Sequence, residues 1–124
     1  MICPTYREIQ VMPLLAICMP ILPGKMEKWQ AMMDHVKSTP EFSESREAVG
    51  VQERTFVQRT PAGDLLIITL EGDDPAASWT KIMATLPPDF AEFAADVHGM
   101  DVNAPPPPLP ELIFDSRSHK QERT

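Results

Sequence analysis

Basic residues are few in this chain, and their scarcity argues against two classes of partner. Lys and Arg number 11 against 18 Asp and Glu, so the formal net charge of the 124 residues is −7 and the isoelectric point is near 4.8. An acidic surface repels both a phosphate backbone and an anionic membrane. We therefore expect neither nucleic acid nor a membrane as a partner.

Cysteine is also scarce. Cys3 and Cys18 are the only two, they form no CxxC pair, and no two histidines have HxxxH spacing on a helix. Such a set provides neither a disulfide framework nor a metal site, so we expect no metal and interpret both cysteines as reduced thiols of a cytoplasmic protein. A Gly-rich phosphate loop, a nucleophile elbow and a cofactor lysine motif are missing too, so the cofactor is unknown.

Long apolar runs are missing as well. The longest, residues 11–22, is too short to span a membrane, is interrupted by Pro13 and Pro20, and is followed by no small-residue cleavage site. Its apolar residues occupy both alternating faces, which is typical of a strand covered above and below.

Amphipathic spacing is present in three segments and predicts three helices. They cover residues 25–39, 74–86 and 89–97, and a short helical turn is expected within 41–48. Asp74 followed by Pro75 is typical of a helix N-terminus, and Gly99 is typical of a C-terminus.

β-Branched and aromatic residues predict a hairpin from strands 51–60 and 65–71, joined by the turn residues 61–64. Residues 104–110 read APPPPLP, which must be extended and is interpreted as a connector rather than an SH3-type ligand. Residues 112–114 are expected to form a fourth strand. The chain then divides into one domain, residues 1–115, and a polar, disordered tail, residues 116–124.

This order predicts an α+β fold, a ferredoxin-like split βαβ unit with an antiparallel sheet. Helices on one face leave the other face bare, and the economical cover is a second copy, which would make a homodimer and close a dimeric α/β barrel. Ile68 is expected on the bare face, where a charge should produce monomers or aggregate. The last strand can return within its own chain or pair across the dimer.

The stretch GVQERTFVQRTPAGDLLIITLEGDDP, with DFAEFAADVHGMDV and the proline-rich approach to the last strand, resembles an uncharacterised bacterial family of the dimeric α/β-barrel superfamily. The resemblance covers roughly residues 14–115. It implies the fold and no particular reaction, because the superfamily includes cofactor-free monooxygenases, isomerases, haem-processing proteins and ligand binders. No motif here maps onto an active site of a characterised member.

Two residues are candidates for proton transfer. Glu53 shares a strand face with Thr55, and a desolvated carboxylate there would be a general base, although an exposed or Arg-paired structural role is equally simple. His98 follows a helix beside Gly99 and Asp101, where it is either an acid, base or ligand, or a helix-end cap.

Three further residues are candidates for ligand binding. Arg46 can hold an anionic group, and Trp29 and Trp79 can line an aromatic pocket, although their spacing also suits a plain core. We therefore expect a small hydrophobic or aromatic molecule to bind between sheet and helices. The alternatives are a cofactor-independent monooxygenase or isomerase that uses Glu53 and His98 for proton transfer, and haem binding through His98.

Overall fold

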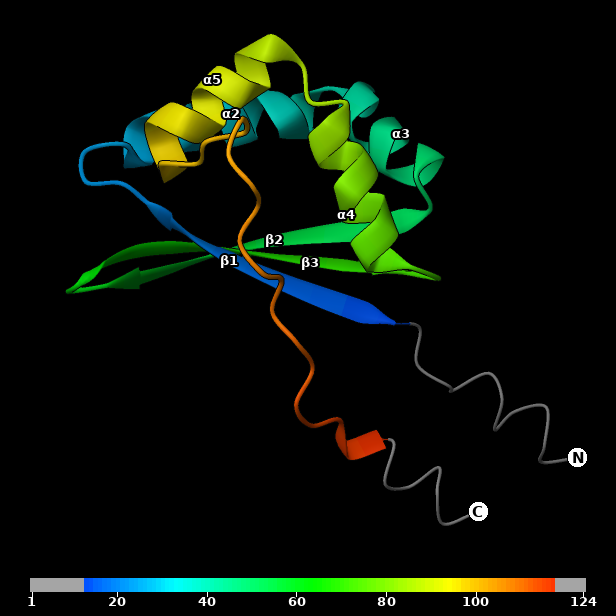
Figure 1. Cartoon of the computed structure of the whole chain (residues 1–124). Helices are drawn as coiled ribbons and strands as arrows, with labels where there is room; N and C mark the ends of the chain where they lie inside the picture. The colour runs from blue at the N-terminus through cyan, green and yellow to red at the C-terminus, as the bar shows by residue number, and fades with distance from the viewer. Residues whose placement is uncertain (1–12, 118–124) are drawn as a thin grey trace, which may run out of the picture.

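The computed structural model describes residues 13–117, which form an α+β fold. The elements follow in the order β1 (Leu14–Ile21), α2 (Met26–Ser38), α3 (Pro40–Ala48), β2 (Val51–Thr60), β3 (Gly63–Gly72), α4 (Pro75–Ala84) and α5 (Pro88–His98). Both β1 and β2 pair antiparallel with β3, so the strand order is β1-β3-β2. All four helices lie on one side of this sheet (Figure 1).

The sequence signals at the element ends are confirmed, with small shifts in the bounds. The Asp74 carboxylate accepts the N–H of Ala77 at 3.1 Å and caps α4 behind Pro75. Gly99 has a φ of 69° and ends α5, with the N–H of Met100 donating to the carbonyl of Ala94. The expected turn within 41–48 is a full helix, α3, that begins at Pro40.

The core lies between the sheet and the helices. Leu70 of β3 and Val97 of α5 are completely buried at its centre, and Trp29 of α2 packs with them. Removing this much apolar surface from water is what holds four short helices against three strands. The remaining members of the cluster are Leu15, Ile17, Ile21, Val51, Leu66, Ile68 and Ile82.

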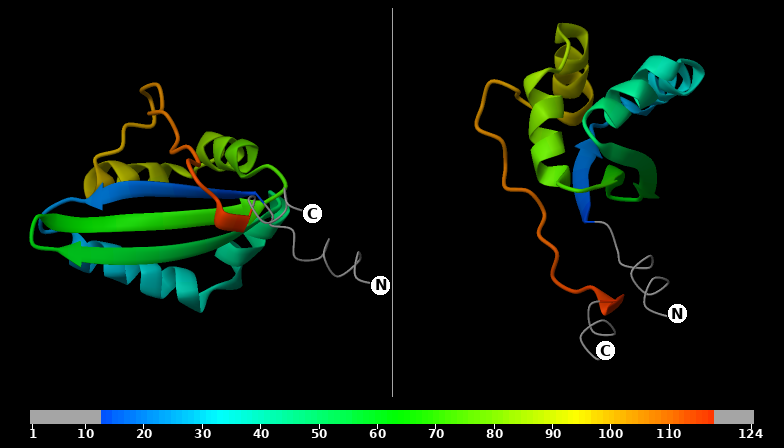
Figure 2. Two further views of the ribbon diagram at one scale, coloured as in Figure 1. Left: turned by 90° about the horizontal axis from the view of Figure 1, so that it is seen from below. Right: turned by 90° about the vertical axis from the view of Figure 1, so that its right-hand side faces the viewer.

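The other face of the sheet has no helix over it (Figure 2). Leu14 and Phe56 are 50% and 51% exposed there. Ile68 was expected on this face, and that expectation is wrong: Ile68 is buried in the core and Ile67 is the outward residue. The β1–β3 register decides the matter, because it places Ile68 opposite Ile17, whose side chain lies under the helices.

The predicted fourth strand is also wrong for the single chain. Residues 111–115 form no strand, and Leu112, Ile113 and Phe114 are 73%, 84% and 69% exposed. The proline run before them cannot donate hydrogen bonds to a sheet edge, so it does not guide these residues onto one. Ser116 and Arg117, at the start of the predicted tail, begin a helical turn.

Some expectations fall outside the described part of the chain. Cys3, the first residues of the predicted domain and residues 118–124 of the predicted tail are among them. Within residues 13–117, none of the helices combines the length and the apolar character needed to cross a membrane.

Candidate functional site

A cavity of about 130 Å³ lies between the sheet and the helices. All five predicted site residues line it: Arg46, Glu53, Trp29, Trp79 and His98. The sheet supplies its floor, since Leu66 and Ile68 of β3 reach it from below, and α2, α4 and α5 supply its roof. The tertiary fold therefore gathers residues from all seven elements around one small, mainly apolar space.

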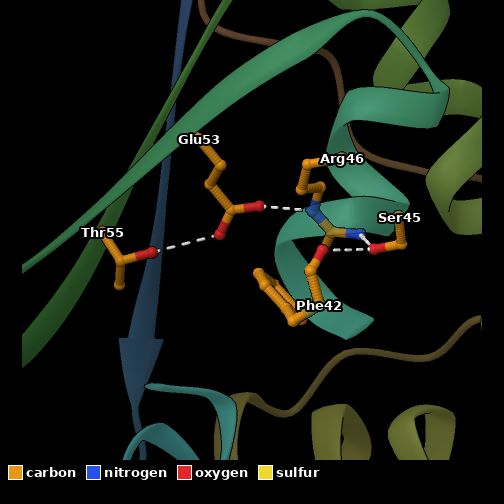
Figure 3. A network of polar contacts seen from close by, with 5 residues as sticks. All are labelled: Phe42, Ser45, Arg46, Glu53 and Thr55. Atoms are coloured by element: carbon orange, nitrogen blue, oxygen red, sulfur yellow. Dashed lines mark hydrogen bonds and ion pairs between the residues drawn. The ribbon is translucent and has the colours of Figure 1, made fainter. Parts of the chain in front are cut away.

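The Arg46–Glu53 pair is the main charged feature of this cavity. Nε of Arg46 in α3 donates to Oε1 of Glu53 in β2 at 2.6 Å, and the Glu53 side chain is only 8% exposed (Figure 3). Oε2 of Glu53 accepts the hydroxyl of Thr55 at 3.1 Å. Both carboxylate oxygens are thus engaged, which agrees with the Arg-paired interpretation of Glu53.

Phe42 also contacts Arg46, and the sequence analysis did not identify this residue as part of the site. The guanidinium carbon of Arg46 lies 4.1 Å from the centre of the Phe42 ring, one helical turn earlier in α3. This cation–π contact holds the guanidinium over the ring while Nε donates to Glu53 of β2. The i,i+4 spacing of Phe42 and Arg46 was the available signal, but it required knowing that residues 40–48 form a helix.

His98 lies at the opposite edge of the sheet from Glu53, since α5 packs on β1 and β2 is the far strand. It is the last residue of α5 rather than a loop residue, and it is buried. Its Nδ1 donates to the carbonyl oxygen of Pro20 at 2.8 Å, so it joins α5 to β1 and does not cap its own helix.

The electrostatics of His98 follow from this burial. Desolvation lowers the pKa of His98 from its ordinary value of 6.5, and the hydrogen bond to Pro20 opposes that shift only in part. The imidazole is therefore neutral at pH 7 with the proton on Nδ1. Nε2 is the ring nitrogen that remains to accept a hydrogen bond or a proton.

The tryptophans differ in their contribution. Trp29 is buried and belongs to the core, whereas Trp79 of α4 is only partly buried. Trp79 and His98 also line a second, larger cavity of about 550 Å³ beside β1, whose outer wall is the proline run 105–110. Sequence spacing could not reveal this second space, because it depends on where the proline run lies.

Within the described residues, no three His, Cys, Asp or Glu side chains come together to hold a metal ion. Compared with protein-family models, with curated proteins and with solved structures, the chain matches none of them. Its function therefore has to be argued from the site.

Proposed function

We propose that this chain binds a small apolar or single-ring aromatic molecule in the cavity between its sheet and helices, and that it does so as a homodimer. The observation that carries the proposal is the cavity itself, about 130 Å³ and lined mostly by apolar side chains. An engineered, closed cavity of ~150 Å³ lined by Leu, Ile and Phe holds one benzene molecule. The cavity here has a similar volume but is partly open to solvent, so its size admits one ring.

The polar side chains that line the cavity decide which ring substituents it prefers. Nε2 of the neutral His98 accepts a hydrogen bond, which favours a ligand with a hydroxyl donor, and the Glu53 charge is balanced by Arg46. Phenol should therefore bind more tightly than toluene, which has the same ring without a donor, and benzoate should bind weakly because the single cation is already paired.

Calorimetric titration with phenol, toluene and benzoate tests this proposal, and α5 offers a matched pair of variants. Ala94 lines the cavity and Ala95 is exposed beside it. Ala94→Leu should fill the space and abolish phenol binding, whereas Ala95→Leu should bind phenol like the parent chain. Circular dichroism checks that both variants are folded. Equal phenol affinity in the two variants, or no phenol binding by the parent chain, would refute a ring-binding cavity.

An enzyme that moves protons is the second candidate, and the presence of Glu53 and His98 on one cavity favours it. His98 is the better base, because both oxygens of Glu53 already accept hydrogen bonds. A carbon acid with one ring, acetophenone, would then exchange its methyl protons with D₂O in the presence of the protein. His98→Asn keeps a donor for the Pro20 carbonyl and removes Nε2, so it should abolish exchange; unchanged exchange would remove His98 from the reaction.

Haem binding through His98 is less well supported. Nε2 is the ring nitrogen left to ligate iron, but the cavity between sheet and helices, about 130 Å³, is far below the ~300–1,000 Å³ of pockets that hold drug-sized ligands. The cavity of about 550 Å³ beside β1, which His98 also lines, lies inside that range, so size argues against haem only in the smaller cavity. A ring-sized ligand suits this cavity better.

The homodimer is supported by the face of the sheet that no helix covers. Leu14 and Phe56 are half exposed there beside Ile67 and Cys18, and such a patch on an antiparallel sheet is the surface that a second sheet would bury. The strand order β1-β3-β2 is also that of a ferredoxin-like sheet without its last edge strand, the one beside β1.

A further inference from the structure

The edge of β1 that points away from β3 has a defined set of open backbone groups. The N–H of Gly72 donates to the carbonyl of Pro13, so in this antiparallel pair the odd-numbered residues of β1 bond to β3. The even-numbered residues therefore direct their N–H and C=O groups to the free edge. Pro20 has no N–H and gives its carbonyl to His98, which leaves Leu14, Ala16 and Cys18 as the open positions.

The free edge of β1 is also unprotected, in contrast to the other edge of the sheet. β1 has no charged side chain, and its only sheet partner within residues 13–117 is β3. β2, at the far edge, has Glu53, Arg54 and Arg59. Charges on an edge strand discourage further pairing, so β1 is the edge that remains suited to receive a strand.

The segment Glu111–Asp115 has the pattern of the strand that would fit. Its sequence ELIFD places Leu112 and Phe114 on one face and Glu111, Ile113 and Asp115 on the other. It follows Pro110, and a proline is tolerated just before a strand. Leu112 and Ile113 are among the most exposed apolar residues of the described chain, which a soluble domain rarely leaves uncovered.

The proline run makes pairing within one chain difficult. His98 fixes the end of α5 at Pro20, and in the matching antiparallel register Glu111 would lie beside Cys18, only ~7 Å away along β1. Residues 105–110, five of them proline, extend ~19 Å and are stiff. Residues 99–104, which contain the turn from Asp101 to Ala104, would have to lead away from β1 by that same length for the stiff run to end beside Cys18. In the structure the run instead passes β1 and continues beyond the sheet (Figure 1).

We propose that residues 111–115 of one chain add as a fourth strand to the free β1 edge of a second copy. The inference rests on the homodimer proposed above and specifies how two chains are joined. Ile113 pairs with Ala16, Glu111 with Cys18 and Asp115 with Leu14, so the open groups of β1 are used. This register puts Pro110 opposite Met19, where no hydrogen bond to the edge is needed.

The exchange also completes the candidate site. In this register Leu112 and Phe114 lie opposite Ile17 and Leu15, on the helix side of the sheet. The 550 Å³ cavity beside β1 borders that position and is lined by Trp79 and His98, which also line the smaller cavity. The partner's two apolar side chains enter this space and close the outer wall behind His98.

Disulfide trapping between two single variants tests the exchange. Ala16→Cys and Ile113→Cys are made in full chains that have Cys3→Ser and Cys18→Ser, mixed in equal amounts and mildly oxidised. A hydrogen-bonded antiparallel pair has a Cα separation of ~5.5 Å, inside the range for a disulfide, so the mixture should give roughly tenfold more two-chain product than a control mixture of Gln58→Cys with Ile113→Cys. Gln58 lies on β2, at the other edge.

The remaining outcomes of this experiment distinguish a failure of the strand exchange from a failure of the homodimer. A 16–113 disulfide within one chain of the double variant, with none in the mixture, would overturn the exchange and place the segment on its own β1 edge. No 16–113 disulfide in either sample would also overturn it, and light scattering of the unmodified chain then decides the rest. If the chain is a dimer, the homodimer proposal stands, with the bare face of the sheet as its interface. If the chain is a monomer, both the strand exchange and the homodimer are refuted.

Discussion

The two faces of the sheet are built by the same three strands and have opposite environments. One step along β1, from Leu14 to Leu15, lowers the exposed fraction of the side chain from 50% to 8%. The helix-covered face holds the core, the Arg46–Glu53 pair and the cavity, whereas the bare face has exposed apolar residues along β1 and the Arg54–Glu71 ion pair towards β2. Apolar character along a strand thus does not identify the inside of one chain, because the apolar residues of an uncovered strand face look the same in sequence.

The largest expected effect comes from a charge placed on each face in turn. Ile68→Asp buries a carboxylate in the core and should prevent folding, because an unpaired charge there costs more than a small domain's whole stability. Ile67→Asp, one residue earlier on the bare face, should give a folded monomer. Circular dichroism and light scattering read the two results. If Ile67→Asp leaves a dimer, the bare face is not the dimer interface.

The second largest effect, a loss of folding free energy, is expected when one charge is removed from an ion pair on each face of the sheet. Glu53→Gln leaves Arg46 mostly buried without its carboxylate and should lower the free energy of unfolding by roughly 1–3 kcal/mol. The control is Glu71→Gln, which breaks the 3.6 Å pair with the exposed Arg54 on the bare face and should cost at most ~1 kcal/mol. Urea unfolding measures both, and equal losses would contradict the special position of the Glu53 pair.

A pH-dependent effect is expected from His98, at the edge of the covered face. Because burial lowers the pKa of His98 in the folded chain, the unfolded chain takes up the proton first as pH falls below about 6.5. This contribution to stability is present above that pH and is lost below it. His98→Asn should flatten the fall in melting temperature between pH 7.5 and 5. His35→Asn, at an exposed position in α2, should retain it, and an unaltered slope in His98→Asn would show that other groups cause the fall.

The smallest effect is expected on the outer surface of the helices, away from both faces. Lys25 and Lys28 of the α2 region hold the Asp96 carboxylate of α5 at 2.8 and 2.7 Å, and the lysine hydrogen bonds lower the pKa of Asp96 to about 2. The pair stabilises the folded chain above pH 4 and loses its effect as pH falls toward 2. Asp96→Asn should lower the melting temperature slightly at pH 7 and not at pH 2. Asp34→Asn, whose 3.8 Å pair with Lys37 is mostly exposed, is the control and should change little.

Local signals accounted for most of the secondary structure. The Asp74–Pro75 start of α4 and the Gly99 end of α5 are short-range chemistry, and the alternation in β2 and β3 depends only on nearest neighbours. Strand and helix periodicity assigned the faces of Glu53, Trp29 and Trp79, and all three line the cavity. Periodicity gave no face for Arg46 or His98, because residues 40–48 were expected to form only a short turn and His98 was placed after its helix. The predictions for Ile68 and for residues 112–114 were wrong, because each depends on which surface has a neighbour.

The sequence by itself determined the helices, the hairpin and the acidic surface, since propensity, capping and charge act over a few residues. Only the tertiary structure decided that Glu53 is paired with Arg46 and Thr55, that His98 donates a hydrogen bond to the carbonyl of Pro20, and that the proline run passes β1. These contacts join residues from separate elements. His98 and Pro20, for example, are separated by 78 positions in the sequence. Such pairings depend on the packing of the whole chain, because close packing brings together side chains that no local pattern connects.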